Sequence, residues 1–345
     1  MPVKLATMNL YHFAKPGIYW HERKDNKTHS DTSWTEKTDW VAATLADMDA
    51  DIVAFQEVVS VDALRQLCEA AGYGEFRCET DPVFDSGDAD IYVNATVAVA
   101  SRHPVTEATA VPALGEIIPE TVIDCTARFS RPPLRCEIDI PGIGGTVVYA
   151  AHFKSQGAFV DDDAMDAIAD WDERIKAYFT QRMHAGVDQV SKRAAEAGAM
   201  YARFREDIEG DIDRPVVLLG DLNEGPGSHT ISILTQSDMI FYIGSVWRAH
   251  IPEEHRFRKY IHRLYDSYTL VSSAETKRPV THAGWDSGET LDYAIVSNGL
   301  NPKNPRRRGT VVGNEVWNDH FVQELPKDVT SDHAPVIVTI EPGAV

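Results

Sequence analysis

The segment VVLLGDLNEGPGS, residues 216–228, holds the pattern on which the fold assignment rests. Its apolar run, Val216–Leu219, has the aliphatic and β-branched composition of a buried strand. Acidic and amide side chains follow at once, at Asp221 and Asn223. Taken alone, these two residues could belong to a turn, with the Gly-Pro-Gly that follows completing it and the serine capping a helix. The segment predicts a strand whose end carries polar groups.

Four other apolar runs are flanked by polar side chains in the same way. These are Asn9 after Val3–Met8, Gln56 and Glu57 after Ile52–Phe55, His152 after Thr146–Ala151, and Ser331-Asp332-His333 before Val336–Ile340. Any one of them could also be a turn or capping residue. Because strand ends on one edge of a sheet lie close together, we expect the five sets to share one cleft.

Short apolar runs alternate with helical patterns along the chain. Further strands are predicted at Thr96–Ala100, Thr121–Phe129, Cys136–Ile140 and Leu291–Val296, and helices at Trp40–Met48 and Val61–Ala71. Within a helical segment over residues 161–209, apolar residues recur at alternating spacings of four and three from Met183 to Ile208, and we expect this stripe to pack against a sheet. The pattern predicts a layered α/β protein, with residues 1–345 forming one domain and polar insertions near 21–39 and 247–263.

The overall composition restricts the partners of the chain. It has 33 Lys and Arg against 53 Asp and Glu, a net charge of −20, which is unlike a protein that holds DNA through its overall field. No run approaches the roughly 20 apolar residues of a membrane helix, and no secretory signal precedes Val3. We therefore expect a cytoplasmic protein, with no membrane and no obligate protein partner. The four cysteines have no zinc-site spacing and are expected to be free thiols.

The polar residues at the strand ends are suited to a hard cation and a phosphate. Magnesium prefers oxygen ligands and takes one or two carboxylates together with water and substrate oxygens. The absence of a Cys/His cluster argues against a zinc site. Phosphoryl transfer needs an activated water, neutralised phosphate oxygens and help for the leaving oxygen, which carboxylates, imidazoles and a cation can supply. The sequence predicts a metal-dependent phosphoesterase.

Six motifs resemble, in the right order, those of the endonuclease/exonuclease/phosphatase (DNase I-like) superfamily. They are Thr7-Met8-Asn9-Leu10, Phe55-Gln56-Glu57-Val58, His152-Phe153-Lys154-Ser155, Gly220-Asp221-Leu222-Asn223-Glu224, Leu291-Asp292-Tyr293 and Ser331-Asp332-His333-Ala334-Pro335-Val336. The resemblance implies a four-layer α/β sandwich, in which helices flank two packed mixed β-sheets, and one or two Mg²⁺ or Mn²⁺ ions.

The resemblance also implies a role for each motif residue. Metal ligands would be Glu57 as the principal one, with Asn9 and Asp332 assisting. Asp221 would orient or deprotonate the attacking water, and Asn223 would hold the phosphate. The remaining residues would serve the phosphate and the leaving group, with His333 contacting phosphate oxygens, Asp292 bonded to its other nitrogen, and His152 acting as a donor. A carboxylate beside His333 should favour the imidazolium.

The substrate is less closely determined by the sequence. The His-Phe-Lys-Ser motif and Arg131 before it look most like bacterial nucleases of the superfamily, which makes Lys154, Arg131 and Arg193 candidate phosphate contacts. Two basic stretches, Arg248–Arg263 and Arg306–Arg308, could form a patch for DNA or, less readily, RNA, with Trp285 and Trp317 beside it. The acidity favours an alternative, a phosphatase or phosphodiesterase for a small molecule or lipid headgroup. A catalytically inactive binding protein is the third possibility.

Overall fold

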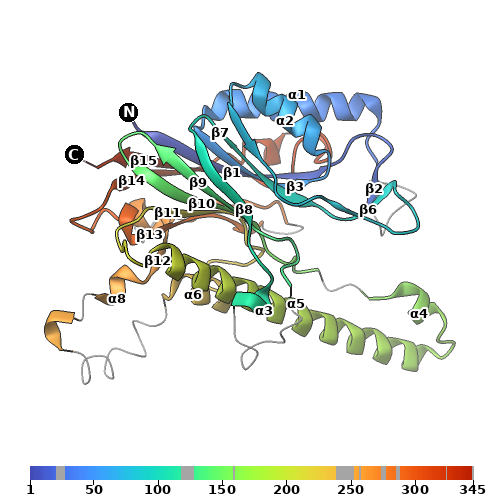
Figure 1. Ribbon diagram of the computed structural model, residues 1–345. Coiled ribbons are helices and arrows are strands. Elements are labelled where there is room, and N and C mark those ends of the chain that lie inside the picture. Colours follow the sequence, from blue (N-terminus) through green and yellow to red (C-terminus); the bar gives the residue numbers. More distant parts are fainter. Residues whose placement is uncertain are drawn as a thin grey trace.

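The computed structural model describes residues 1–20, 28–117, 128–157, 160–237, 252–255, 258–272, 277–284, 288–323 and 325–343. Two six-stranded sheets pack face to face, and helices cover their outer faces (Figure 1). This arrangement confirms the expected four-layer α/β sandwich.

The first sheet has the strand order β14-β15-β1-β3-β7-β4. In chain order its strands are β1 (Val3–Phe13), β3 (Ile52–Val58), β4 (Glu75–Arg77), β7 (Thr96–Ser101), β14 (Gly309–Val316) and β15 (Val336–Pro342). Strands β1 and β3 are parallel, whereas the other neighbours in this sheet are antiparallel. Two helices lie on its outer face, α1 (Asp31–Met48) and α2 (Val61–Ala70) (Figure 1).

The second sheet has the order β12-β13-β11-β10-β9-β8. Its strands are β8 (Val105–Ala110), β9 (Leu134–Ile140), β10 (Gly144–His152), β11 (Val216–Asp221), β12 (Leu264–Asp266) and β13 (Asp292–Ser297). Strands β10 and β11 form its parallel pair. The outer face is covered by α5 (Trp171–Asp207) and α6 (His229–Thr235), with the short α3 (Leu114–Ile117) beside them (Figure 1).

Shorter elements lie around the sandwich. A small third sheet has the order β2-β6-β5. Its strands are β2 (Tyr19–Trp20), β5 (Val83–Phe84) and β6 (Ile91–Asn94). The remaining helices are α4 (Asp162–Asp166), α8 (Arg258–Ile261) and α9 (Ser267–Val271), with 3₁₀ turns η1 (Glu253–His255), η2 (Asn298–Leu300) and η3 (Asp319–Val322).

The alternation of side chains along the strands builds the layers. Leu5 and Ile52 of the first sheet pack with Val148 and Val217 of the second in the core between the sheets. The sequence neighbours of the first-sheet residues, such as Val53, point to the other side and pack beneath α1 and α2, whereas those of the second-sheet residues, such as Val147, pack beneath α5. Because successive side chains of a strand point to opposite faces of the sheet, each central strand contributes residues to two cores. Burial on both faces explains why the central strands read as continuous apolar runs.

The strand directions give the sandwich two chemically different ends. We call the end where β1, β3, β10 and β11 finish the carboxyl end, and the end where they begin the amino end. Strand β13 is antiparallel to β11, so it starts at the carboxyl end with Asp292 opposite Asp221. The polar residues that follow the apolar runs are thereby brought to one end of the molecule.

Helix α5 departs from the expectation that its whole apolar stripe packs on a sheet. Phe204 and Ile208 are buried, but Met183, Val187 and Val190 are 56%, 63% and 54% exposed. The helix has 37 residues and is about 55 Å long at 1.5 Å per residue. The strand β10 has 9 residues and spans only about 30 Å. The first half of α5 therefore extends beyond the sandwich together with α4 (Figure 1).

Several other expectations fall in or near undescribed stretches. The insertion expected near residues 21–39 contains, from Asp31 onward, the first half of α1, where Lys37 is buried. Residues 121–127 of the expected strand Thr121–Phe129, and with them Cys125, lie outside the described residues. Cys68, Cys78 and Cys136 are free thiols, as expected. No helix in the described part of the chain is long and apolar enough to cross a membrane.

Candidate active site

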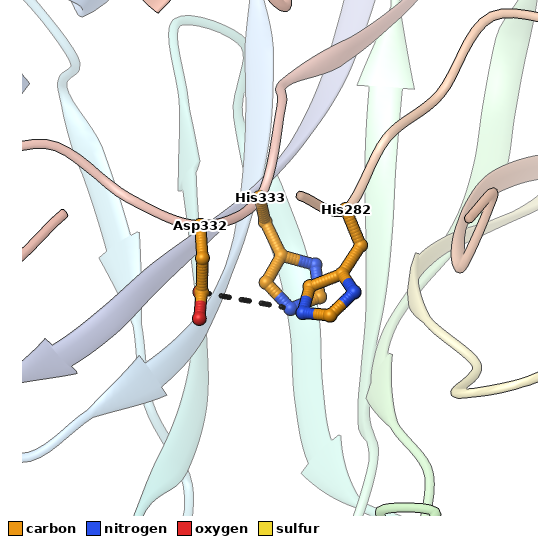
Figure 2. Close-up of side chains that lie close together, drawn as sticks. All are labelled: His282, Asp332 and His333. Carbon is orange, nitrogen blue, oxygen red and sulfur yellow. Dashed lines mark ion pairs between the residues drawn. The ribbon is translucent and has the colours of Figure 1, made fainter. Parts of the chain in front are cut away.

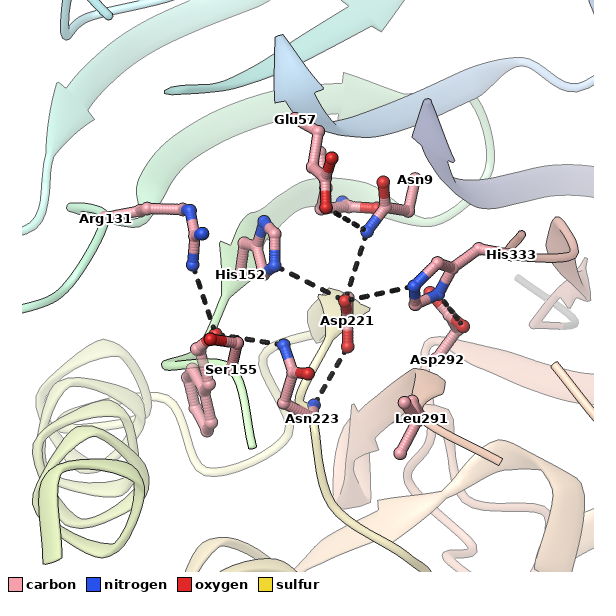
Figure 3. A network of polar contacts seen from close by, with 12 residues as sticks. Asn9, Glu57, Arg131, His152, Ser155, Asp221, Asn223, Leu291, Asp292 and His333 are labelled. Atoms are coloured by element: carbon pink, nitrogen blue, oxygen red, sulfur yellow. Dashed lines mark hydrogen bonds and ion pairs between the residues drawn. The ribbon is translucent and has the colours of Figure 1, made fainter. Parts of the chain in front are cut away.

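The carboxyl end of the sandwich gathers side chains from both sheets (Figure 3). They are Asn9 of β1, Glu57 of β3, His152 of β10, Asp221 of β11, Asn223 just after it, Asp292 of β13, and His333 before β15. Except for Glu57, which is half-buried, all of these are buried. Residues from the first and last tenths of the chain thus share one polar cluster, and two facing sheets are needed to form it.

The backbone at this cluster adopts unusual conformations. Among the described residues, six non-glycine residues have positive φ, and two of them, Asp49 and Gln236, end helices in the ordinary left-handed way. The others are Tyr11, His12, Glu57 and Asn223. Left-handed backbone at non-glycine residues is uncommon and concentrates at functional sites. Here it accompanies breaks in strand register after Asn9 and Phe55 that turn side chains toward the cleft.

Asp221 is the centre of the cluster. Its Oδ2 lies 3.1 Å from Asn9 Nδ2, 3.3 Å from His152 Nε2 and 3.7 Å from His333 Nε2, and its Oδ1 accepts from the Asn223 amide at 2.9 Å. Burial raises the pKa of Asp221 and the nearby Asp292 adds to the rise, against the lowering effect of His333. A carboxyl with a raised pKa is suited to exchanging a proton near neutral pH.

The pKa values of the two imidazoles at Asp221 are shifted in opposite directions. Burial works against the charged form of His333, but Asp292, with Oδ2 2.9 Å from Nδ1, and Asp221 together raise its pKa well above the ordinary value. Burial lowers the pKa of His152 well below its ordinary value, and Arg131 lowers it further. These shifts favour the imidazolium at His333 and the neutral imidazole at His152.

Glu57 is an ionised carboxylate at the edge of the cluster. Burial would raise the pKa of Glu57, but His12, His152 and Arg131 together bring it below its ordinary value. The His12 amide donates to Glu57 Oε2 at 2.8 Å. Asn9 directs its amide nitrogen toward Glu57 Oε1, at 3.5 Å, while its oxygen accepts from the Tyr11 amide. Asn9 thus contacts the carboxylates as a donor in this arrangement.

Two groups of side chains, in the part of the chain that the structure describes, have donor atoms close enough to hold one cation. They are Asp221 with Asp292 and His333, and His282 with Asp332 and His333. Asp292 Oδ1 and Asp332 Oδ1 are buried without a hydrogen-bond partner. Buried oxygens of this kind are costly unless paired, so they fit a divalent cation. Glu57 belongs to neither group, and its expected role as a ligand stays a prediction.

A cavity of about 510 Å³ opens beside Glu57. Its lining includes Trp20 of β2, the loop residue Arg131, Lys154 after β10 and Lys192 of α5. Burial lowers the pKa of Lys154, and the like charges of Arg131 and Lys192 lower it further. Lys192 is paired with Asp188 at 2.8 Å, and together with Arg131 and Lys154 it gives this wall of the cavity a charge suited to an anion.

The third predicted phosphate contact, Arg193, does not line this cavity. It is 4% exposed. Its Nε binds Glu224 at 2.6 Å, and its terminal nitrogen donates to the carbonyls of Lys154 and Ser155 at 3.3 and 3.0 Å. Arg193 supports the loop that carries Lys154. An arginine at a helix position facing the sheet is better placed to bind the loop backbone than to reach a ligand.

The two basic stretches do meet, but not beside this cluster. Arg263 and Arg306, with Tyr260, Tyr265 and Lys303, line a cavity of about 540 Å³ at the amino end. Strand β13 carries Asp292 at one end and leads into this cavity at the other. The described parts of the two stretches therefore form no patch beside the cluster, and their expected role in binding nucleic acid stays a prediction. Residues 248–251, 256–257 and Trp285 lie outside them, and Trp317 packs in the core beneath α1 and α2.

Sequence patterns missed several residues of the site. His12 and Tyr92 contact each other beside Glu57, Trp20 and Lys192 line the cavity, and the ring of His282 lies 4.7 Å from that of His333. His12 had a usable signal, because it follows Asn9 within the same apolar stretch. The others lie in short strands, a long helix and a loop, where nothing in the local pattern marks a functional side chain.

The family model described as "Endonuclease/Exonuclease/phosphatase family" matches residues 6–333. The chain belongs to this family. Members are phosphoester hydrolases and are generally metal-dependent. A search of curated proteins found no match.

Several solved structures share the fold of this chain. An endonuclease/exonuclease/phosphatase from Bacteroides vulgatus has a TM-score of 0.56 at 17% identity, covering 99% of this chain and 100% of its own. The human nocturnin catalytic domain with bound sulfate has a TM-score of 0.56 at 15% identity, covering 99% and 95%. A mannosyl-6-phosphatase from Bacteroides thetaiotaomicron has a TM-score of 0.54 at 16% identity, covering 98% and 99%. At these identities the likeness extends to the fold alone.

Proposed function

We propose that this protein is a divalent-metal-dependent hydrolase of a small phosphoester that carries a second anionic group. The observation that supports it most is the cavity of about 510 Å³ beside Glu57, with Arg131, Lys154 and Lys192 in its wall. A cavity of that size suits a small ligand. The cations would hold the second anionic group while the ester bond lies against the polar cluster.

The residues of the cluster fit a divalent cation, with Glu57, Asn9 and Asp332 as its expected holders and Asp292 behind them. When bound, Mg²⁺ or Mn²⁺ would polarise the phosphate and offset its charge. Lone buried oxygens at Asp292 and Asp332 are the feature that favours such an ion. The assignment of individual ligands is part of this proposal.

The protein side chains would handle water, phosphate and protons. Asp221, with its raised pKa, would orient the attacking water and take its proton. The imidazolium of His333, held by Asp292, would donate to a non-bridging phosphate oxygen. His152 and the Asn223 amide would lie at the same phosphate. Asn223 already donates to the Phe153 carbonyl at 3.1 Å, which fixes its orientation.

A nuclease acting on the end of a nucleic acid is the second candidate. Trp20 is half-buried in the wall of the cavity and offers a ring on which a terminal base could stack. A long duplex has less support, because the described parts of the basic stretches line the amino-end cavity and the net charge is −20. The first candidate is therefore preferred.

A substrate panel separates the two candidates. Purified protein is incubated with sugar phosphates, nucleoside bisphosphates, bis-p-nitrophenyl phosphate, single-stranded DNA, RNA and plasmid, in Mg²⁺, in Mn²⁺ and in EDTA. We expect metal-dependent hydrolysis, fastest for a compact ester with a second phosphate. Efficient cleavage of internal bonds in plasmid, with no small ester hydrolysed, would overturn the first candidate. Failure on every substrate in both metals would overturn both.

A further inference from the structure

A cluster of three donors extends the polar site beyond the residues assigned to the reaction. His282, Asp332 and His333 each offer one ligand atom, and these atoms lie within 4.8 Å of one another (Figure 2). His333 Nε2 is 4.0 Å from Asp332 Oδ1. Neither the sequence motifs nor the proposed reaction gives His282 a role.

Two atoms of this cluster lack a partner. His282 Nδ1 and Asp332 Oδ1 are both buried, and neither has a hydrogen-bond partner among the described residues. Leaving a buried polar atom unpaired costs about 1–3 kcal/mol. The other oxygen of Asp332 is already held by Lys327 Nζ at 3.4 Å, so the free oxygen is the one turned to the imidazoles. Asp332 Oδ1 therefore faces the imidazoles without a hydrogen-bond partner, as a free ligand atom of a metal site would.

The surrounding backbone holds the donors in position. His282 exchanges both of its backbone hydrogen bonds with Glu289, at 2.9 Å each, and the next amide, of Ala283, donates to the Asp332 carbonyl at 2.8 Å. Asp292 accepts from His333 Nδ1, which leaves His333 Nε2 facing the cluster. A carboxylate behind a ligating histidine is the usual support of a transition-metal site.

We propose that His282, Asp332 and His333 form a binding site for a transition-metal ion of the Zn²⁺ type, and that occupancy of this site inhibits the enzyme. Two imidazole nitrogens and one carboxylate oxygen suit zinc better than magnesium, and binding of the ion would displace the proton of His333 Nε2. Tetrahedral ligands about 2.0–2.1 Å from zinc stand about 3.4 Å apart, so a small rotation of Asp332 or His333 completes the site. The ion would occupy the nitrogen with which His333 meets the phosphate and an oxygen of Asp332.

The inhibitory part rests on the proposed function, whereas metal binding does not. Binding is measured on the metal-free protein with Co²⁺, whose visible absorption reports nitrogen ligation, and by displacement of Co²⁺ with Zn²⁺. His282→Ala is the test variant, and His282→Asn replaces it if the alanine variant fails to fold. His262→Ala is the matched control, since His262 also has a buried Nδ1 without a partner but belongs to neither donor group.

We expect one Co²⁺ per chain in the wild type and in His262→Ala, with affinity reduced roughly tenfold or more in the His282 variant. Unchanged affinity and spectrum in the His282 variant would overturn the site. In Mg²⁺-supported turnover, Zn²⁺ should inhibit the wild type at a concentration at least about tenfold lower than the variant requires. Equal Zn²⁺ inhibition of both would overturn the inhibitory role. If no substrate is hydrolysed, the proposed function fails while the Co²⁺ titration still tests the site.

Discussion

The two ends of the sandwich both carry charged side chains, but they use them differently. At the amino end the charges meet opposite charges, as in Arg306 with Asp213 at 2.9 Å and Arg214 with Glu137 at 2.6 Å. At the carboxyl end, Asp221 and Asp292 face each other across paired strands, and Asp292 Oδ1 has no hydrogen-bond partner. Ion pairs exposed to solvent contribute little to the stability of the protein beyond local structure. Crowded, buried and incompletely paired charges are costly, and their presence marks a functional site.

This comparison implies that changes at the carboxyl end reduce activity more than they reduce stability, and that equivalent changes at the amino end leave activity intact. It also implies that the carboxyl end lowers the stability of the protein. The following predictions test these statements, from the largest effect to the smallest.

Glu57→Gln should have the largest effect. It keeps the shape of the side chain but removes the negative charge that the His12 amide and Arg131 stabilise. We expect turnover to fall by about a thousandfold or more, and calorimetric Mg²⁺ affinity to fall with it. The matched change at the amino end is Glu137→Gln, which should leave turnover and Mg²⁺ affinity unchanged. Normal Mg²⁺ binding by Glu57→Gln would remove Glu57 from the metal site.

Asp292→Asn should reduce kcat by about a hundredfold with a smaller change in KM. Because Asp292 raises the pKa of His333, its removal lowers that pKa. If the imidazolium is the active form, activity is lost as pH rises through this pKa, so the alkaline limb of the kcat profile moves to lower pH in the variant. An alkaline limb that stays in place would show that the Asp292–His333 pair does not govern it.

Lys154→Ala should raise KM by about tenfold and leave kcat nearly unchanged, as expected for loss of one charged contact with a bound anion. Its comparison is Lys303→Ala, which removes an exposed lysine from the amino-end cavity and should alter neither constant. Steady-state kinetics on the best substrate of the panel measures both. A tenfold rise in KM for Lys303→Ala would show that the anion site lies at the amino end and would contradict the assignment to Lys154.

Lys37→Met tests the stability cost of the carboxyl end. Lys37 is buried beneath the site, with its amine donating to the Thr330 carbonyl, and burial lowers its pKa to about 7 while Asp332 and Glu57 oppose the shift. Above pH 7 the unfolded state holds more protons at this lysine than the folded state does. The wild-type free energy of unfolding should therefore gain up to about 1.4 kcal/mol per pH unit from this residue between pH 7 and 10.

In Lys37→Met this pH-dependent gain is absent, and the variant should be at least as stable as the wild type at pH 7. Urea unfolding of both proteins in EDTA at pH 7 and pH 9 measures the difference. Parallel changes with pH in the two proteins would contradict the buried neutral amine.

The sequence was sufficient for the fold and for much of the polar cluster. Both faces of the central strands are buried, which explains the apolar runs Val3–Met8, Ile52–Phe55 and Val216–Leu219. The ends of these runs could therefore be located in the sequence, and the convergence of the ends could be inferred. The motif order then supplied the family. Trp20 and His282 are brought to the site by tertiary contacts alone, and the local periodicity of the sequence does not indicate them.

Two features of the structure that the sequence does not predict have one physical origin. The apolar stripe of α5 does not show where the sheet beneath it stops, so the exposure of Met183 and Val187 could not be foreseen. Likewise, the basic stretch Arg306–Arg308 does not show at which end of a strand it will lie. Periodicity defines the face of an element, whereas the partner of that face depends on distant parts of the chain.

The most direct test of the central claim compares one aspartate from each end. Asp221→Asn and Asp213→Asn are assayed beside the wild type for kcat/KM with Mg²⁺ on the best substrate of the panel, and each is checked for thermal stability. We predict that Asp221→Asn loses at least about a thousandfold while remaining folded, and that Asp213→Asn stays within about twofold of the wild type. Near-normal activity of Asp221→Asn, or an equal loss in both variants, would contradict the assignment of the reaction to the carboxyl end.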